Sequence, residues 1–295
     1  MKKLTLALLS LAFTLALPLK SGAETVLERV ARTGVLTVGT PTDIVPLAYV
    51  NEQQELVGYS VDFLNLLKDQ IQTQLGREIA LQFVEITPSD GIPKLMSEEV
   101  DIICNAGFSW ERDKFVDFSL SMGISGTQIL VKQNTNLGSI DSLKGKRVAA
   151  IPKTIAEQVI RVSQPDATVV TVESMQQGFE AVEQGKVDAF AADGIILEGY
   201  QQTVSQPNAY KVVPEQPYNR QGIACMVPEN NSKFLDTINF TIVRLMQGYL
   251  AQEPSSVEII ERWFGSQGII TVEPELIRNY FQDVINSREQ IFIQQ

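Results

Sequence analysis

Two charged residues, Arg112 and Asp193, stand where ligand-binding chemistry is expected. Arg112 lies in CNAGFSWERDKFVDFS (104–119), between a short apolar run and a Val-Asp-Phe-Ser run. Asp193 directly follows the apolar run VDAFAA (187–192). A guanidinium binds a carboxylate through two parallel hydrogen bonds, and a carboxylate binds an ammonium. If these two side chains faced each other, they would suit the two charged groups of an α-amino acid.

Both residues also have a purely structural interpretation. Arg112 could pair at the surface with Glu111, Asp113 or Asp117. Asp193 could cap the helix that follows it. The spacing alone leaves both interpretations open.

Alternating strands and helices must position these residues. Apolar runs predict strands, and apolar residues at helical spacing predict helices. The predicted strands are 35–40, 79–86, 100–106, 126–132, 146–151, 167–172, 187–192 and 221–227. The predicted helices are 59–76 (ending at Gly76), 91–100, one from about Ile155, 174–185, 231–250, 256–265 and 275–287. This alternation predicts an α/β fold with parallel sheets.

Two segments of the chain resemble each other. SEEVDIICNAG (97–107) and EQGKVDAFAADG (183–194) each contain a helix end, a Val-Asp pair, a strand and a small-residue exit. Two similar lobes around a cleft are the simplest architecture, and open α/β sheets bind ligands beyond the carboxyl ends of their strands. We therefore expect Arg112 and Asp193 to meet at one site from opposite lobes.

The composition narrows the classes of function. A formal charge of −11 over 295 residues disfavours nucleic acid, whose affinity comes largely from Lys and Arg. The chain has no histidine, which is the commonest general base and metal ligand. We expect no nucleic-acid partner, no metal, no cofactor and no catalytic site.

The first 23 residues have the pattern of a secretory signal peptide. Lys2 and Lys3 precede an apolar run, 4–19, and Ser21-Gly22-Ala23 supplies small residues. This pattern predicts cleavage before Glu24 and export to the periplasm. The run is short for a membrane anchor, and no later segment reaches the length of a membrane span.

An exported protein with an even number of cysteines can form a disulfide. Cys104 and Cys225 both lie in short apolar runs. Two buried thiols are the alternative.

From Gly34 to about Gly265 the chain resembles the bacterial periplasmic amino-acid-binding proteins, the polar amino-acid solute-binding family of ABC importers. The order and spacing of several stretches carry the resemblance. These are GVLTVGT, VPLAYV and LVGYSVDFL (34–64), GIPKLMSEEVDII (91–103), WERDKFVDFS (110–119), LKGKRVAAI (143–151), VDAFAAD (187–193) and RWFG (262–265).

The resemblance implies a type II periplasmic-binding-protein fold, in which two hinge strands join two α/β lobes and the ligand lies in the interlobe cleft. Lobe 1 would comprise 24–124 plus 220–295, and lobe 2 would comprise 125–219. The tail 266–295 contains the amphipathic stretch 275–287, which predicts one more helix that packs.

The resemblance also assigns roles to residues. Arg112 would bind the α-carboxylate of the ligand, Asp193 the α-ammonium, and Thr154 would add a carboxylate contact. Backbone groups within 105–109 would complete the site, which brings in Asn105, Gly107 and Phe108. Phe108 could equally belong to the core.

The glutamate/aspartate-binding branch is the most similar, which implies a Cys104–Cys225 disulfide. That branch binds the acidic side chain with basic residues at three positions, where this chain has Pro41, Gly91 and Met175. An unpaired buried ligand carboxylate would be costly, so we expect glutamate and aspartate to be disfavoured.

Two carboxylates near those positions suggest a different ligand. Asp43 and Asp90 could face a cationic side chain, which favours a cationic or a neutral polar L-amino acid. They could also be solvated loop or cap residues.

The function implied is that of a monomer that captures a free L-amino acid and delivers it to an inner-membrane ABC permease. One alternative is an exported cyclohexadienyl or arogenate dehydratase-like enzyme on the same fold. Such enzymes use an acidic residue where this chain has Ile196, with Glu198 displaced from that position. The other alternative is a ligand-sensing binding protein.

Overall fold

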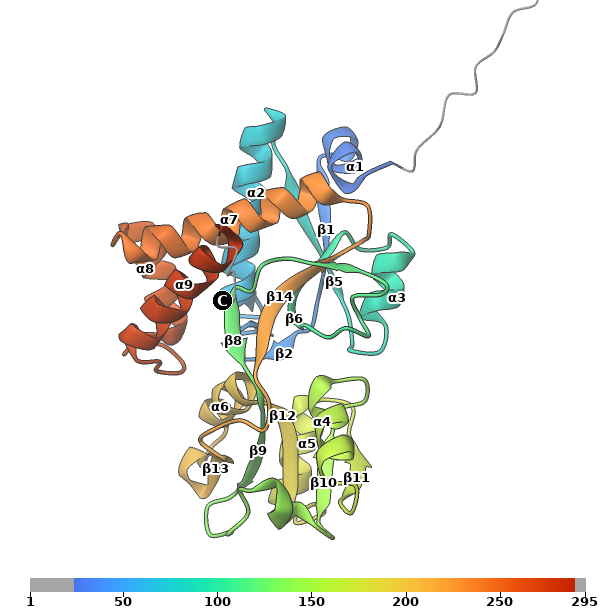
Figure 1. Cartoon of the computed structure of the whole chain (residues 1–295), viewed down its shortest axis with the longest axis vertical. Coiled ribbons are helices and arrows are strands. Elements are labelled where there is room, and N and C mark those ends of the chain that lie inside the picture. The colour runs from blue at the N-terminus through green and yellow to red at the C-terminus, as the bar shows by residue number, and fades with distance from the viewer. Residues whose placement is uncertain (1–23, 290–295) are drawn as a thin grey trace, which may run out of the picture.

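The protein forms two α/β lobes joined by strands that run between them (Figure 1). The computed structural model describes residues 24–289, so the predicted signal peptide lies outside the described residues. The connecting strands are β8 (Gly123–Ser125), β9 (Thr127–Lys132) and β14 (Gln221–Val227). Within the described part of the chain, no helix has the length and apolar character needed to span a membrane.

A six-stranded mixed sheet forms the centre of lobe 1. Its order is β5 (Ala80–Glu85), β1 (Val35–Thr40), β6 (Ile102–Gly107), β14 and β7 (Asp117–Phe118), with β8 paired to β14. A small antiparallel sheet adds β2 (Asp43–Ile44), β3 (Ala48–Val50) and β4 (Leu56–Val57). This small sheet places the segment after β1 next to the cleft.

A five-stranded sheet forms the centre of lobe 2. Its order is β11 (Thr168–Thr171), β10 (Arg147–Ala150), β12 (Ala189–Asp193), β9 and β13 (Tyr210–Val213). Ile129 and Leu130 of β9 belong to different hydrophobic clusters. Since successive side chains of a strand point to opposite faces, the sheet is covered on both faces.

The sheets are only partly parallel, which corrects the prediction of parallel sheets. Strands β5, β1 and β6 are parallel, as are β11, β10 and β12. The connecting strands β14 and β9 instead pair antiparallel with β6 and β12. Each enters its sheet directly from the other lobe, without the crossover helix that a parallel neighbour requires.

The predicted helices form, and local chemistry explains their ends. Helix α2 (Tyr59–Leu75) ends at Gly76, whose φ of 64° suits a residue without a side chain. Helix α4 (Ile155–Ser163) begins after Thr154, whose Oγ accepts a hydrogen bond from Glu157 N at 3.2 Å. The other helices are α1 (Val26–Thr33), α3 (Gly91–Met96), α5 (Met175–Glu183), α6 (Gly194–Thr203), α7 (Ser232–Leu250), α8 (Pro254–Phe264) and α9 (Pro274–Glu289), with short 3₁₀ turns at Ile140–Leu143 and Pro207–Ala209.

The predicted tail helix is α9, and it packs on lobe 1. Ile277, Phe281 and Val284 are buried in the largest hydrophobic cluster together with residues of α2 and α7. The Tyr280 hydroxyl donates to the carbonyl of Gly123 at 2.9 Å and lies 2.5 Å from Ser121 Oγ. The tail therefore contacts the point at which the chain leaves lobe 1.

The two cysteines form a disulfide, as predicted. Cys104 of β6 and Cys225 of β14 face each other across neighbouring strands and are joined by an S–S bond. The bond ties a strand of the lobe 1 sheet to the strand on which the chain returns from lobe 2.

Candidate binding site

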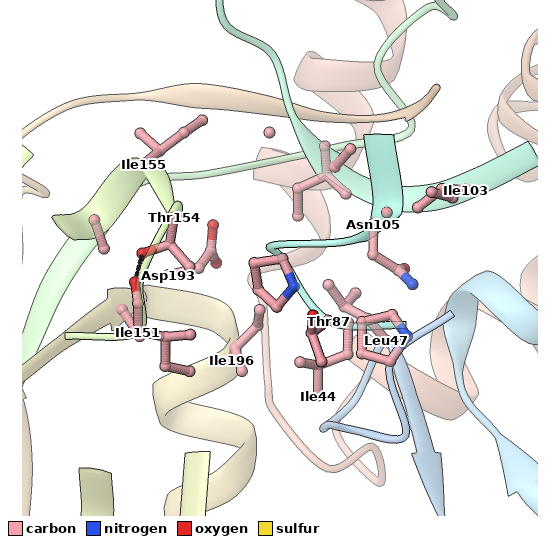
Figure 2. Close-up of a pocket in the computed structure, with 18 of the residues that line it drawn as sticks. Ile44, Leu47, Thr87, Ile103, Asn105, Ile151, Thr154, Ile155, Asp193 and Ile196 are labelled. Atoms are coloured by element: carbon pink, nitrogen blue, oxygen red, sulfur yellow. Dashed lines mark hydrogen bonds between the residues drawn. The ribbon is translucent and has the colours of Figure 1, made fainter. Parts of the chain in front are cut away.

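A cavity of about 180 Å³ lies between the two lobes. Its wall includes residues at or just after the carboxyl ends of β1, β6, β10 and β12, where open α/β sheets bind ligands. Figure 2 shows Thr154 and Asp193 of lobe 2 on one side and Asn105 and Leu47 of lobe 1 on the other. The carboxyl ends of β6 and β12, the strands of the two similar segments, therefore face one cleft.

Arg112 presents its guanidinium to this cavity. The side chain donates to the carbonyl of Gly107 and to the carbonyl of Lys153, each at 3.0 Å. Lys153 belongs to lobe 2, so Arg112 already contacts both lobes. Among the described residues, no carboxylate lies within 4.0 Å of it. Partial burial lowers the pKa of this guanidinium, and a partly desolvated cation without a counter-ion is suited to an anionic ligand.

Asp193 ends β12 and presents a carboxylate to the same cavity. It accepts hydrogen bonds from Gln221 Nε2 at 3.0 Å and from Ser125 Oγ. The residue occupies the N-cap position of α6, so the backbone N–H groups of Ile195 and Ile196 in the first turn also face its carboxylate. Burial raises the pKa of the carboxyl group, and hydrogen bonds from Ser125, from Gln221 and from the backbone of Ile195 and Ile196 partly oppose that rise. In the described part of the chain, no Lys or Arg lies within 4.0 Å of it.

Three further predicted residues lie in the wall: Thr154, Asn105 and Gly107. The Thr154 hydroxyl donates to Ile151 O at 2.7 Å and caps α4, so it is already engaged. The wall also contains Ile155 and Ala156, which begin α4. Backbone N–H groups of a first helical turn have no partner within the helix and attract anions, so this terminus can contribute to the carboxylate site.

Asn105 has a φ of 94°, which is rare for a residue other than glycine. Ser60 Oγ donates to its side-chain carbonyl. Such backbone conformations persist only where surrounding contacts hold them, and they gather at functional sites. The amide group of Asn105 therefore has a fixed orientation at the edge of the cavity (Figure 2).

Phe108, Asp43 and Asp90 are not in the wall of the cavity. Phe108 packs edge-to-face against Trp110 and Phe118, with ring centroids 5.0 and 5.1 Å apart. These contacts turn its ring toward other aromatic side chains and away from the ligand space.

The two carboxylates have local partners instead. Asp43 Oδ2 accepts from Met175 N of lobe 2 at 3.3 Å, and burial raises its pKa. Asp90 accepts from Thr87 N at 2.6 Å and lies 3.6 Å from Lys94 Nζ. The prediction of a cationic ligand depended on Asp43 or Asp90 facing the ligand, and neither carboxylate lies in the cavity wall.

The three positions that bear on an acidic ligand are all in the wall. Pro41, Gly91 and Met175 line the cavity and bring no positive charge to it. Ile196 also lines the cavity, at the position where a dehydratase-like enzyme would need an acid. Glu198 is exposed and absent from the wall, although partial desolvation and the charge of Asp193 raise its pKa.

Sequence reasoning missed two residues that position Asp193. Ser125 and Gln221 lie on strands β8 and β14. The only signal available was their location at the predicted crossings between lobes. Within the described residues, no cluster of three or more His, Cys, Asp or Glu side chains could hold a metal ion.

Residues 36–266 match the model of the bacterial extracellular solute-binding proteins, family 3. The chain belongs to this family. The family-3 relatives include a glutamate/aspartate import solute-binding protein of Salmonella typhimurium, 27% identical over 274 residues, which span 90% of this chain and 87% of the relative. The L-cystine-binding protein TcyJ of Escherichia coli is 28% identical over 267 residues, which span 88% of this chain and 94% of the relative.

Solved structures agree with this membership. An ancestral arginine-binding protein bound to glutamine superposes with a TM-score of 0.69 at 26% identity, over 79% of this chain and 99% of that chain. An ancestral amino-acid-binding protein described as a precursor of cyclohexadienyl dehydratase has a TM-score of 0.69 at 23% identity, over 81% of this chain and 99% of that chain. At that identity the likeness concerns the fold alone, which is the two-lobed type II fold.

Proposed function

We propose that this family-3 protein captures a free L-amino acid between its lobes and delivers it to the permease of an ABC importer. One observation carries the proposal. Arg112 and Asp193 have opposite charges, have no ionic partner among the described residues, and line one cavity from different lobes. The names of the relatives, which are amino-acid-binding proteins, support the same function.

The proposed mode of binding assigns one ligand group to each lobe. The α-carboxylate pairs with the Arg112 guanidinium and faces the N-terminus of α4, while the α-ammonium pairs with Asp193. Arg112 and Asp193 then each gain the counter-ion that they lack in the ligand-free protein. Because the closed form offers both partners at once, the ligand binds that form more tightly and shifts the lobes toward it.

The proposal includes a preference against acidic ligands, since Pro41, Gly91 and Met175 supply no cation to the wall. It also includes export through the predicted signal peptide and action as a monomer in the periplasm. Lobe boundaries at 124/125 and 219/220 remain part of the proposal, although the first falls one residue before the end of β8, which pairs with β14 in the lobe 1 sheet.

Titration calorimetry on the mature protein tests the proposal. Residues 24–295 would be unfolded and refolded to remove any bound ligand, then titrated with each of the twenty L-amino acids. We expect at least one to bind. The exposed Trp110, two residues before Arg112, offers a fluorescence signal for the same titration.

The variant Arg112→Ala tests the site itself. We expect binding to weaken by about 2–5 kcal/mol, since the ligand carboxylate loses its buried partner. The fold should persist, because the side chain gives up only its two hydrogen bonds to main-chain carbonyls. Arg161→Ala, which removes an exposed arginine paired with Glu157, is the matched control. Silence with all twenty amino acids, or full affinity in Arg112→Ala, would reject the proposal.

An enzymatic role has one observation in its favour, the raised pKa of Glu198. Because Glu198 is not in the wall, we expect no product when the protein is incubated with prephenate or arogenate. Product formation that disappears in Glu198→Gln would mean that the protein is an enzyme and not a transport binding protein. A sensing role would instead show as capture of a receptor by the ligand-bound protein and not by the ligand-free one.

A further inference from the structure

The cavity wall has no charged residue left to pair with a charge on the side chain of the ligand. Among the described residues that line the cavity, Arg112 is the only cation and Asp193 the only anion. The proposed function assigns both to the α-carboxylate and α-ammonium of the ligand. A third ligand charge, of either sign, would be buried without a partner, which is costly.

The rest of the wall is mostly apolar. In Figure 2, Ile44 and Leu47 of lobe 1 lie across the cavity from Thr154 and Asp193, and Ile196 extends toward them from lobe 2. Ile103 and Met175 also contribute to the wall. Branched aliphatic side chains and a thioether thus surround the space beyond the two charged anchors, and apolar ligand groups are stabilised by leaving water for such a surface.

The polar side chains of the wall are largely engaged with the protein itself. Thr154 caps α4, Gln221 donates to Asp193, and Thr87 Oγ donates to Asp90 at 2.9 Å. Asn105 accepts from Ser60, and its amide nitrogen points toward the Leu47 and Thr87 end of the cavity (Figure 2). That nitrogen could meet the amide oxygen of glutamine, or more weakly the sulfur of methionine. Glutamine is therefore the decisive comparison.

We propose that the ligand is an L-amino acid with an aliphatic or thioether side chain, of the type of leucine, isoleucine, valine or methionine. This inference rests on the proposed function and names the ligand class of the same site. The cavity volume of about 180 Å³ suits a molecule of that size. The side chain contacts Ile44, Leu47 and Ile196, and its burial adds specificity to the two charged anchors.

Competition titration on the refolded mature protein tests the inference. We expect at least one of leucine, isoleucine, valine and methionine to bind about tenfold or more tightly than glutamine, arginine, lysine and glutamate. If one of those four polar ligands binds as tightly as the best aliphatic one, and Arg112→Ala abolishes its binding, the inference fails while the proposed function stands. If no amino acid binds, the proposed function itself fails.

Two neighbouring isoleucines of α6 provide a matched pair of variants. Ile196 lines the cavity, whereas Ile195 does not, and both pack partly against the lobe 1 cluster. Ile196→Thr replaces the ethyl arm of a wall side chain by a hydroxyl, which removes apolar contact and adds a polar group, so we expect affinity for the aliphatic ligand to fall about tenfold. Ile195→Thr should leave it within about twofold. Thermal melts show whether each variant is folded, and unchanged affinity in folded Ile196→Thr would overturn the inference.

Discussion

Gln221 Nε2 donates to the Asp193 carboxylate at 3.0 Å, so the anion of the cleft is held by a strand that connects the lobes. Ser125 Oγ, at the end of β8, holds the other oxygen of the same carboxylate. Asp193 itself belongs to the lobe 2 sheet. The residue proposed to bind the ammonium is thus in direct contact with both crossings of the chain.

Replacing Asp193 should have opposite effects on binding and on stability. We expect Asp193→Asn to weaken binding by about 2–5 kcal/mol, because the buried ammonium loses its counter-ion. Burial raises the pKa of Asp193, which means that the charged form is disfavoured in the folded, ligand-free protein. The ligand-free variant should therefore melt at a higher temperature than the wild type. Calorimetry and thermal melts measure both quantities, and a lower melting temperature would contradict the electrostatic account.

Binding should depend on pH through the same carboxyl group. As the pH falls through the raised pKa of Asp193, the group gains a proton and no longer attracts an ammonium. Affinity should therefore begin to fall at a higher pH than an ordinary aspartate would give. In Glu198→Gln, which removes a neighbouring acid of raised pKa, the fall should persist. In Asp193→Asn it should vanish.

The stability of the ligand-free protein should change in the opposite sense. A carboxyl group with a raised pKa in the folded state binds its proton more tightly than in the unfolded state. Its contribution to the free energy of unfolding therefore declines as the pH rises from the ordinary aspartate value through the raised one. Urea unfolding at several pH values, with wild type and Asp193→Asn compared, isolates this contribution. Equal pH dependence in the two proteins would assign the effect to other groups.

Asp43 offers a direct test of the ligand charge. Its carboxylate accepts from Met175 N across the lobes and lies outside the cavity wall. We expect Asp43→Asn to leave the order of ligand preference unchanged, with Asp90→Asn as a companion variant outside the wall. Tight arginine or lysine binding by the wild type that is lost in either variant would restore the cationic prediction.

Replacing Tyr280 should lower the stability of the protein at the crossing between the lobes without changing ligand specificity. Tyr280→Phe removes the hydrogen bond to Gly123 O, for which we expect a loss of about 0.5–1.5 kcal/mol in the free energy of unfolding. Ligand specificity should not change, since Tyr280 does not line the cavity. Denaturant unfolding measures the first effect and calorimetry the second. Tyr249→Phe, whose hydroxyl contacts Glu261 at 3.4 Å away from the crossing, is the control.

Much of the fold could be predicted from local pattern. The end of α2 at Gly76 and the start of α4 after Thr154 follow from capping chemistry that adjacent residues supply. The direction of β9 and β14 could not be predicted in this way. Their apolar runs look like those of parallel strands, and only the path of the chain between lobes makes them antiparallel.

The part of the candidate site that could be predicted consists of charged residues that follow predicted strands. The places of Arg112 and Asp193 in the cavity wall could be predicted because each follows a predicted strand and matches a charged residue of the family pattern, whereas their binding of ligand stays a prediction. Asp43 was misplaced because proximity in sequence to wall residues does not say which way a side chain turns. Its bond to Met175 N depends on the approach of the other lobe, which no local pattern encodes.

The Cys104–Cys225 bond has a topological consequence, because every strand of the lobe 2 sheet lies between the two cysteines in the chain. The disulfide closes a covalent ring that contains this whole sheet. A protease that cuts one exposed loop of lobe 2 would open the ring without releasing a fragment, and the nicked protein would separate into two pieces only under reducing conditions. In an oxidising compartment, the protein can thus be cut once in lobe 2 and still keep both walls of the cleft in one molecule.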